Sequence, residues 1–157
     1  MKKIIILFLI VMPRFLLAQN WTPEEKTILD RVKTGWSSWQ DAVNNKDYSI
    51  WLKAADPAED FQGWWLDDGA LGNPNDSKKH FDLIIKDIKK YYWINVKPLS
   101  IKVYEDVAFI WFYASYATEN LKGNITWYEE KRFEAYRKID GKWRWSAGMT
   151  KTKTIDD

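Results

Sequence analysis

The side chains best suited to acid–base chemistry in this sequence are two adjacent aspartates, one histidine and one glutamate. Asp67 and Asp68 follow a tryptophan pair, and burial in a dry pocket raises the pKa of an aspartate toward the range that proton transfer needs. Asp-Asp-Gly is also an ordinary turn, which is the preferred interpretation. His80 is the only histidine, and Glu129 lies two residues before Lys131, where an ion pair is the simpler role. Asp67, Asp68, His80 and Glu129 are therefore the candidate catalytic residues.

No motif indicates a metal, a cofactor or a covalent nucleophile. One histidine and no cysteine leave no cluster with the spacing of metal ligands. Neither a Ser-His-Asp or Cys-His motif nor a glycine-rich phosphate loop is present. A reaction, if there is one, is expected to be a lyase or isomerase step by proton transfer without a cofactor.

Aromatic side chains offer more surface for binding than the polar ones offer for catalysis. The sequence has 11 tryptophans, and flat rings can stack on a ligand. Trp36, Trp39 and Trp51 fall on the apolar faces of predicted helices and are assigned to the core. The aromatic candidates for ligand binding are Trp64, Trp65, Trp111, Tyr113, Trp127, Tyr128 and Trp145.

The first 18 residues differ from the rest of the chain. Met1-Lys2-Lys3 precedes an apolar run from Ile4 to Met12, and the small residue Ala18 follows at the expected cleavage point. This pattern is typical of a secretory signal peptide cleaved near Ala18, and it predicts a bacterial periplasmic or secreted protein that is free of the membrane after cleavage. A retained N-terminal anchor is the alternative.

Loss of this leader changes the charge balance. Lys2, Lys3 and Arg14 leave with it, so 24 basic residues become 21 against 22 acidic ones, a net charge of about −1. No basic stripe remains of the kind that binds a phosphate backbone, so nucleic acid is not an expected partner.

The expected order of elements is helix, short helix, loop and helix, followed by strands. Thr22-Pro23-Glu24-Glu25 forms a capping box that opens the first helix, and Asp47 caps a second helix that ends at Asp56. Residues 57–76 are interpreted as a long irregular connection, after which Ser77 caps a third helix.

Aromatic and β-branched runs dominate the C-terminal third. The short turn signals between them, Asp140-Gly141 among them, predict consecutive antiparallel strands. Pro98 marks an edge strand or a bulge. Helices followed by strands indicate an α+β domain, in which about three N-terminal helices cover one face of a curved sheet.

Alternation along these strands predicts which side chains share a face. It places Met149 with Trp145 on the inner face, and Glu129 with Lys131 near the mouth, so Met149 and Lys131 join the candidate ligand-binding residues. The run 107–116 is aromatic on both faces. Its outer face needs a cover, and a homodimer through that face is the natural candidate.

Three local patterns, taken in order, carry a family resemblance. They are Phe61-Gln-Gly63-Trp64, then Lys97-Pro98 through Val103 with Asp106-Val107-Ala108, and finally Lys138-Ile-Asp140-Gly141-Lys142-Trp143. In these the sequence resembles the nuclear transport factor 2-like superfamily, near its secreted bacterial SnoaL-like members. The resemblance implies a domain over residues 22–152, with a cone-shaped fold whose curved, mixed and mostly antiparallel sheet encloses a pocket. The superfamily includes isomerases, dehydratases, cyclases and binding modules, so shared fold does not give shared chemistry.

Two positions depart from the pattern that the resemblance implies. Members often carry a histidine near the end of the last strand, where this sequence has Met149. They often carry an arginine on the penultimate strand, where counting reaches Lys131 with Arg132 one position away. A slip of one residue reverses the face, so the sequence leaves open which of the two cations faces the pocket.

The missing histidine favours binding over catalysis, because it removes the usual acid–base group near neutral pH. The preferred function is a secreted protein that binds a small apolar or aromatic molecule in an aromatic-lined pocket. A metal-free lyase or isomerase and a homodimeric protein-interaction module are the alternatives.

Overall fold

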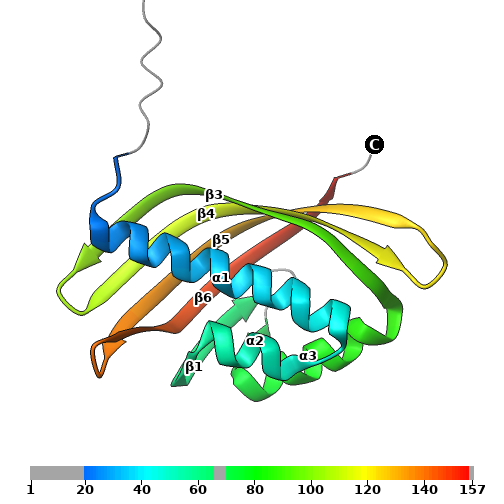
Figure 1. Ribbon diagram of the computed structural model, residues 1–157, viewed down its shortest axis with the longest axis horizontal. Helices are drawn as coiled ribbons and strands as arrows, with labels where there is room; N and C mark the ends of the chain where they lie inside the picture. The colour runs from blue at the N-terminus through cyan, green and yellow to red at the C-terminus, as the bar shows by residue number, and fades with distance from the viewer. Residues whose placement is uncertain (1–19, 66–69, 156–157) are drawn as a thin grey trace, which may run out of the picture.

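A computed structural model of the chain describes residues 20–65 and 70–155. Within these ranges three helices and six strands follow one another (Figure 1). Their bounds are α1 Pro23–Asn45, α2 Tyr48–Ala55, β1 Pro57–Trp65, β2 Ala70–Gly72, α3 Pro74–Asp87, β3 Ile88–Tyr104, β4 Val107–Asn120, β5 Ile125–Ile139 and β6 Lys142–Ile155. No helix in the described ranges is both long enough and apolar enough to cross a lipid bilayer. The segment 1–18, interpreted as a signal peptide, lies outside them.

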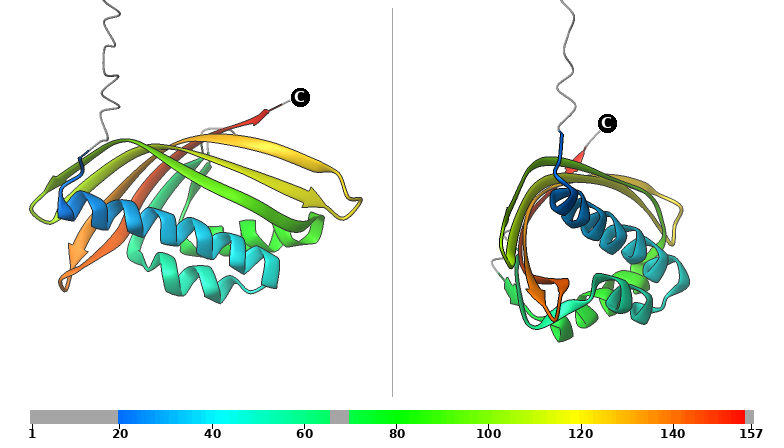
Figure 2. Two further views of the ribbon diagram at one scale, coloured as in Figure 1. Left: turned by 45° about the horizontal axis from the view of Figure 1, so that its top comes forward. Right: turned by 60° about the vertical axis from the view of Figure 1, so that its left-hand side comes forward.

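One curved sheet connects the strands in the order β2-β1-β6-β5-β4-β3. Neighbouring strands are antiparallel except β1 and β6, which run parallel. In Figure 2 the sheet curves around α1, and α2 and α3 lie on its open side. The predicted α+β class, with a curved, mixed and mostly antiparallel sheet behind N-terminal helices, is confirmed.

The first two helices begin where the sequence predicts. The Thr22 hydroxyl accepts a hydrogen bond from the Glu25 amide at 3.2 Å, and the Glu25 carboxylate accepts one from the Thr22 amide at 2.8 Å. Asp47 accepts a hydrogen bond from the Ser49 amide at 2.9 Å and caps α2. Each cap pairs an amide that has no partner within its own helix.

The third helix begins earlier than predicted. Asn73 is its N-cap, Pro74 occupies the first turn, and Asp76 completes a second capping box, whereas Ser77 is buried within the helix. The prediction of Ser77 as the cap is wrong, because Asn-Pro is the stronger start signal. His80 consequently lies beyond the first turn of α3.

The region interpreted as an irregular connection contains β1 and β2. Gly63 pairs with Gly148 of β6 in the parallel direction, and the register shifts between Pro57 and Gln62. That shift breaks the alternation of buried and exposed positions by which a strand is recognised. The proline, glycines and aspartates of the segment also favour a loop interpretation, so the strand was hidden from sequence reasoning.

Pro98 lies, as predicted, on an edge strand and next to a bulge. β3 is the last strand of the sheet order, and its pairing with β4 shifts between Pro98 and Ser100. A residue without an amide hydrogen is tolerated at such an edge bulge.

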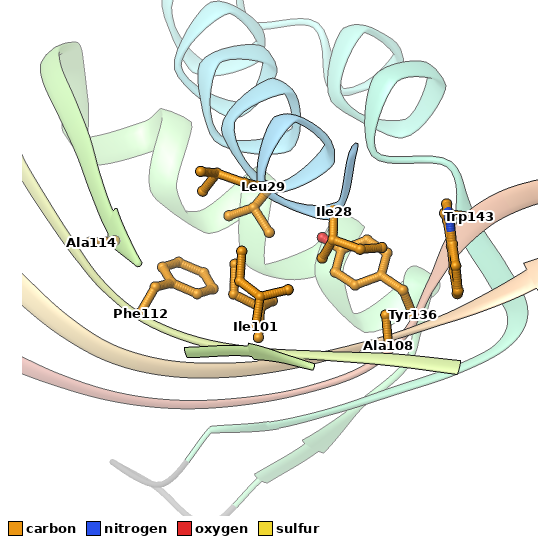
Figure 3. Packing of buried hydrophobic residues seen from close by; sticks show 10 residues of the cluster. Ile28, Leu29, Ile101, Ala108, Phe112, Ala114, Tyr136 and Trp143 are labelled. Atoms are coloured by element: carbon orange, nitrogen blue, oxygen red, sulfur yellow. The ribbon is translucent and has the colours of Figure 1, made fainter. Parts of the chain in front are cut away.

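Two groups of buried side chains pack between the helices and the inner face of the sheet. The first, against the N-terminal half of α1, is shown in Figure 3 and comprises Ile28, Leu29, Val32, Ile101, Ala108, Ile110, Phe112, Ala114, Tyr136 and Trp143. The second, near α2 and α3, comprises Ala42, Val43, Tyr48, Trp51, Ala55, Phe81, Tyr91 and Tyr116. Members of both groups line the cavity described next.

Candidate functional site

A cavity of about 160 Å³ lies inside the cone. Its aromatic walls are five indole rings, those of Trp36, Trp39, Trp51, Trp65 and Trp145. They come from α1, α2, β1 and β6, so elements far apart in the sequence jointly form the cavity. Their large flat faces form the apolar part of its wall.

The inner face of β5 contributes the polar side of the cavity. Side chains alternate along a strand, so Glu130, Arg132 and Glu134 share one face, and all three line the cavity. Tyr136 continues the row, and Tyr116 of β4 lines the cavity as well.

The face predicted for β5 is the wrong one. Glu129 forms an ion pair with Lys153 at 3.2 Å, and Lys131 is exposed and pairs in register with Tyr113; these residues lie on the outer face of the sheet. Arg132, not Lys131, therefore faces the cavity. The prediction failed because a row of charged side chains is normally solvated, whereas here opposite charges neutralise one another inside.

A β-bulge in β6 determines which of its residues face the cavity. Tyr136 pairs with Trp145 and Ala135 with Ala147, so Ser146 has no partner in the register. Trp145 lines the cavity before the bulge, and Met149, after it, lies on the outer face opposite Phe133. The expectation that Met149 and Trp145 share a face is wrong, because the extra residue reverses the alternation.

Arg132 lies at the centre of an ion-pair network. Its Nη1 is 2.9 Å from Glu130 Oε2, and its Nη2 is 3.2 Å from Glu134 Oε1. The guanidinium carbon is 4.8 Å from the ring centre of Trp36 and 6.0 Å from that of Trp145, within the range of cation–π attraction. Only 14 % of the side chain is exposed. Burial alone would lower the pKa of Arg132, but Glu130 and Glu134 hold that pKa above its ordinary value, so the residue stays charged.

Each glutamate of the network also accepts a hydrogen bond from a tyrosine hydroxyl. Tyr116 donates to Glu130 Oε1 at 2.9 Å, and Tyr136 donates to Glu134 Oε2 at 2.7 Å. Burial first, and then the neighbouring carboxylate, raises the pKa of both Tyr116 and Tyr136, so the phenols remain protonated donors. Both oxygens of each carboxylate are therefore engaged, one by a phenol and one by Arg132.

Arg132 retains donors that this network does not use. A guanidinium has five N–H groups, and its Nε is buried with no hydrogen-bond acceptor among the described residues. A buried donor without a partner costs about 1–3 kcal/mol. Nη1 and Nη2 each carry two N–H groups and each contact one glutamate, so the donors that a ligand acceptor in the cavity would meet are on these terminal nitrogens.

A second arginine in the cavity lining serves the fold. Arg31 donates through Nη1 to the Ala54 carbonyl at 3.2 Å and through Nη2 to the Ala55 carbonyl at 2.9 Å. These carbonyls end α2, where the helix dipole favours a cation. Arg31 thereby connects α1 to α2 and holds one side of the cavity.

The structure brings two of the predicted ligand-binding residues, Trp65 and Trp145, to the cavity. Tyr128 stacks on Tyr116, with 5.0 Å between ring centres, on the inner side of the sheet. The remaining candidates lie on the outer face, and they are Trp64, Trp111, Tyr113, Trp127, Lys131 and Met149. Of the predicted ligand-binding residues, Trp65 and Trp145 therefore remain candidates for binding in the cavity.

The two candidate catalytic residues that the structure describes, His80 and Glu129, lie apart. His80 lines the cavity from α3, with its ring 6.4 Å from that of Trp65, whereas Glu129 lies on the outer face. Asp67 and Asp68 lie outside the described residues. Over residues 20–65 and 70–155, no group of three His, Asp or Glu side chains could hold a metal ion.

Sequence reasoning missed the glutamates on either side of Arg132. The signal that could have found them is the spacing Glu130-x-Arg132-x-Glu134, which puts three charges of alternating sign on one strand face. A carboxylate at both neighbouring positions lets an arginine be buried, because it supplies counter-charge on two sides.

The pKa of the Glu134 carboxyl group is raised in the folded protein. Burial raises the pKa of Glu134, and the Arg132 charge and the Tyr136 hydrogen bond oppose the shift without cancelling it. As the pH rises, Glu134 therefore loses its proton at a lower pH in the unfolded chain than in the folded protein. Between the two pKa values the folded state binds more protons, so stability falls with rising pH, starting from the unfolded value of about 4.3.

We expect Glu134→Gln to remove this pH dependence while keeping an acceptor for Tyr136. The free energy of unfolding of the wild type minus that of the variant should fall as the pH rises from about 4 and level off above the folded pKa of Glu134. Urea denaturation across this range measures the difference. Glu129→Gln, on the outer face, is the control and should show no such fall. A flat difference for Glu134→Gln would contradict the raised pKa.

Comparison with solved structures identifies the fold. A conserved protein from Planctomyces limnophilus matches with a TM-score of 0.68 and 11% identity, over 83% of this chain and 99% of that one. A nuclear transport factor 2-like protein from Cytophaga hutchinsonii matches with a TM-score of 0.59 and 15% identity, over 84% and 100%. A hexachlorocyclohexane dehydrochlorinase from Novosphingobium barchaimii gives 0.64 and 11%, over 85% and 94%.

This chain therefore has the nuclear transport factor 2-like fold, and the resemblance noted in its sequence is confirmed at the level of fold. No protein-family model matches the sequence, and a search of curated proteins finds no match either. The structures similar to this chain include an enzyme, and the fold alone does not define the chemistry.

Proposed function

We propose that the protein binds a small organic molecule that combines a flat apolar ring with a hydrogen-bond acceptor. The observation that carries the proposal is the tryptophan-walled cavity with Arg132 in its lining. Its volume of about 160 Å³ is close to that of a cavity of roughly 150 Å³ known to bind benzene. One ring with a small polar substituent therefore fits the space.

The cavity walls support this proposal because they are held in place before a ligand arrives. Trp51 meets Trp39 edge to face at 5.5 Å and Trp145 at 6.1 Å, and the indole of Trp145 donates to the Ala147 carbonyl at 2.9 Å. Rings fixed by packing and hydrogen bonds lose little freedom when a ligand binds, so more of the gain from apolar burial appears as affinity.

A proton-transfer enzyme is the alternative, and the raised pKa of Glu134 is the observation that favours it. A general base also needs an oxygen free to reach the substrate proton. Tyr136 and Arg132 engage the two oxygens of Glu134, and Tyr116 and Arg132 engage those of Glu130. This arrangement suits the positioning of Arg132 better than proton removal, so binding is the better-supported function.

Gly35 offers a direct test of whether the cavity is the binding site. It lines the cavity from α1, and a Cβ built there meets no atom within 4 Å. We expect Gly35→Leu to fill the space and weaken the binding of acetophenone by roughly tenfold or more. The helix should remain intact, because glycine is the poorer helix former by about 0.5–1 kcal/mol relative to alanine. Titration followed by the tryptophan indole NMR signals gives the affinity.

Thr27→Leu is the matched control for this experiment, because Thr27 is on the same helix but exposed and outside the cavity lining. It should leave acetophenone binding unchanged. Equal affinity in the wild type and in Gly35→Leu would place the binding site elsewhere.

We also propose that two copies associate through the outer face of the sheet. Trp64, Met149, Phe133 and Trp111 pair in register across β1, β6, β5 and β4, forming one apolar row, and Trp111 is 40% exposed. An exposed row of this kind is usually covered. A twofold axis lets the same row cover itself on both copies, so no other partner is needed.

We expect the wild type to sediment as a dimer and Trp111→Glu to sediment as a monomer, because a charge in the centre of the row cannot be buried unpaired. Analytical ultracentrifugation measures both. Leu83→Glu, at an exposed apolar position on α3, is the control and should remain dimeric. A wild type that stays monomeric at its highest soluble concentration would remove this proposal.

A further inference from the structure

We infer that the cavity selects uncharged ring compounds and excludes anionic acids of the same shape. This inference rests on the proposed binding function and specifies its ligand class. It follows from the charges that line the cavity in the described ranges, where Arg31 and Arg132 face Glu130 and Glu134. These two arginines and two carboxylates leave a formal sum of zero.

The charge of Arg132 is already shared by two buried carboxylates. Glu130 and Glu134 contact its two terminal nitrogens at 2.9 and 3.2 Å, and their side chains are 9% and 5% exposed. A ligand carboxylate that approached the remaining N–H groups would be the third anion around one guanidinium. Repulsion between like charges is weakly screened in such a site, and the ligand would also lose its hydration.

The other cations of the lining do not offset a third anion. The terminal nitrogens of Arg31 are bonded to the Ala54 and Ala55 carbonyls, which hold them at the end of α2. His80 is exposed to solvent on α3, where interactions between charges are weakened. An added anion would therefore leave the cavity with a net negative charge.

A neutral carbonyl avoids this penalty and still meets the unused donors of Arg132. Arg132 lines the cavity, and Nη1 and Nη2 each contact one carboxylate oxygen although each carries two N–H groups, which leaves hydrogen-bonding capacity at the guanidinium. A ketone oxygen accepts such a hydrogen bond and adds no net charge. Acetophenone and benzoate have almost the same shape and differ in charge, so they are a matched pair of probes.

The test is a titration of the protein with acetophenone and with sodium benzoate at neutral pH, followed by the indole NMR signals. We expect acetophenone to bind roughly tenfold tighter or more. Glu134→Gln removes one carboxylate but keeps an acceptor for Tyr136 and Arg132, so the sum of lining charges becomes positive. It should shift the ratio of the two affinities roughly tenfold toward benzoate.

Two variants complete the design. Glu129→Gln removes a carboxylate from the outer face and should leave both affinities unchanged. Glu130→Gln removes the second carboxylate of the network and should shift selectivity toward benzoate in the same direction as Glu134→Gln, which keeps the test open if Glu134→Gln does not fold.

The possible failures are distinguishable. Benzoate binding as tightly as acetophenone in the wild type, or unchanged selectivity in both network variants, would overturn the inference and leave the binding function standing. Failure of both probes to bind would overturn the proposed function, and the inference with it.

Discussion

Arg132→Met is expected to destabilise the folded protein by about 3–5 kcal/mol at neutral pH, because it removes one partner of a buried ion pair. Glu130 and Glu134 would then be buried together without the guanidinium that now contacts both. Methionine fills much of the same space and keeps contact with the indole rings, so the loss reports charge rather than volume. Urea denaturation measures the change in free energy of unfolding.

Two comparisons identify the cause of this loss. Lys131→Met removes the neighbouring cation from the outer face and should cost less than about 1 kcal/mol. In a background that carries Glu130→Gln and Glu134→Gln, Arg132→Met should cost much less than in the wild type, because no buried anion is left unpaired.

The stability lost in the Arg132→Met variant should be smaller at acidic pH than at neutral pH. Without the cation, the buried glutamates hold their protons more strongly than the unfolded chain does, so the loss should shrink as the pH falls toward about 4.3. A loss that is the same at all pH values, or equal to that of Lys131→Met, would contradict the buried network.

Phe112→Ala is expected to cost about 3–5 kcal/mol, as is usual when a fully buried aromatic side chain is removed. Phe112 is only 1% exposed and packs beneath α1 among the residues of Figure 3. It also pairs in register with Arg132 on β5. Its removal should therefore enlarge the space beside the cavity as well as weaken the core. Thermal or urea unfolding gives the magnitude.

Phe109→Ala is the control, because Phe109 belongs to the same strand but to the opposite face, where it stacks on Phe133 at 5.9 Å between ring centres. In the monomer it should cost clearly less than Phe112→Ala. A dimer through the outer face would add a contribution that depends on protein concentration, so both variants should be unfolded at two concentrations. Equal losses at low concentration would contradict the assigned faces of β4.

Much of the fold could be predicted because local signals carry it. The capping box at Thr22, the cap at Asp47 and the turn at Asp140-Gly141 each depend on neighbours in the sequence. β1 could not be predicted in the same way. Its parallel partner β6 is distant in the sequence, and the register shift near its start removes the alternation that would have identified it.

The candidate site could be predicted less well than the fold, because it depends on which face of each strand turns inward. Alternation separates Lys131 from Arg132 but does not say which is inside. Burial of Arg132 depends on Glu130 and Glu134 neutralising it and on indole rings brought from other elements. Those contacts exist only once the sheet has curved around α1.

The central claim is that the cavity beneath α1, and not the aromatic outer face, is where a ligand binds. The most direct test is to titrate acetophenone while following assigned indole NMR signals, comparing Trp36 and Trp145 in the cavity with Trp111 on the outer face. We predict that the signals of Trp36 and Trp145 shift together and saturate while that of Trp111 does not move. Saturable shifts at Trp111, with Trp36 and Trp145 unchanged, would contradict the account.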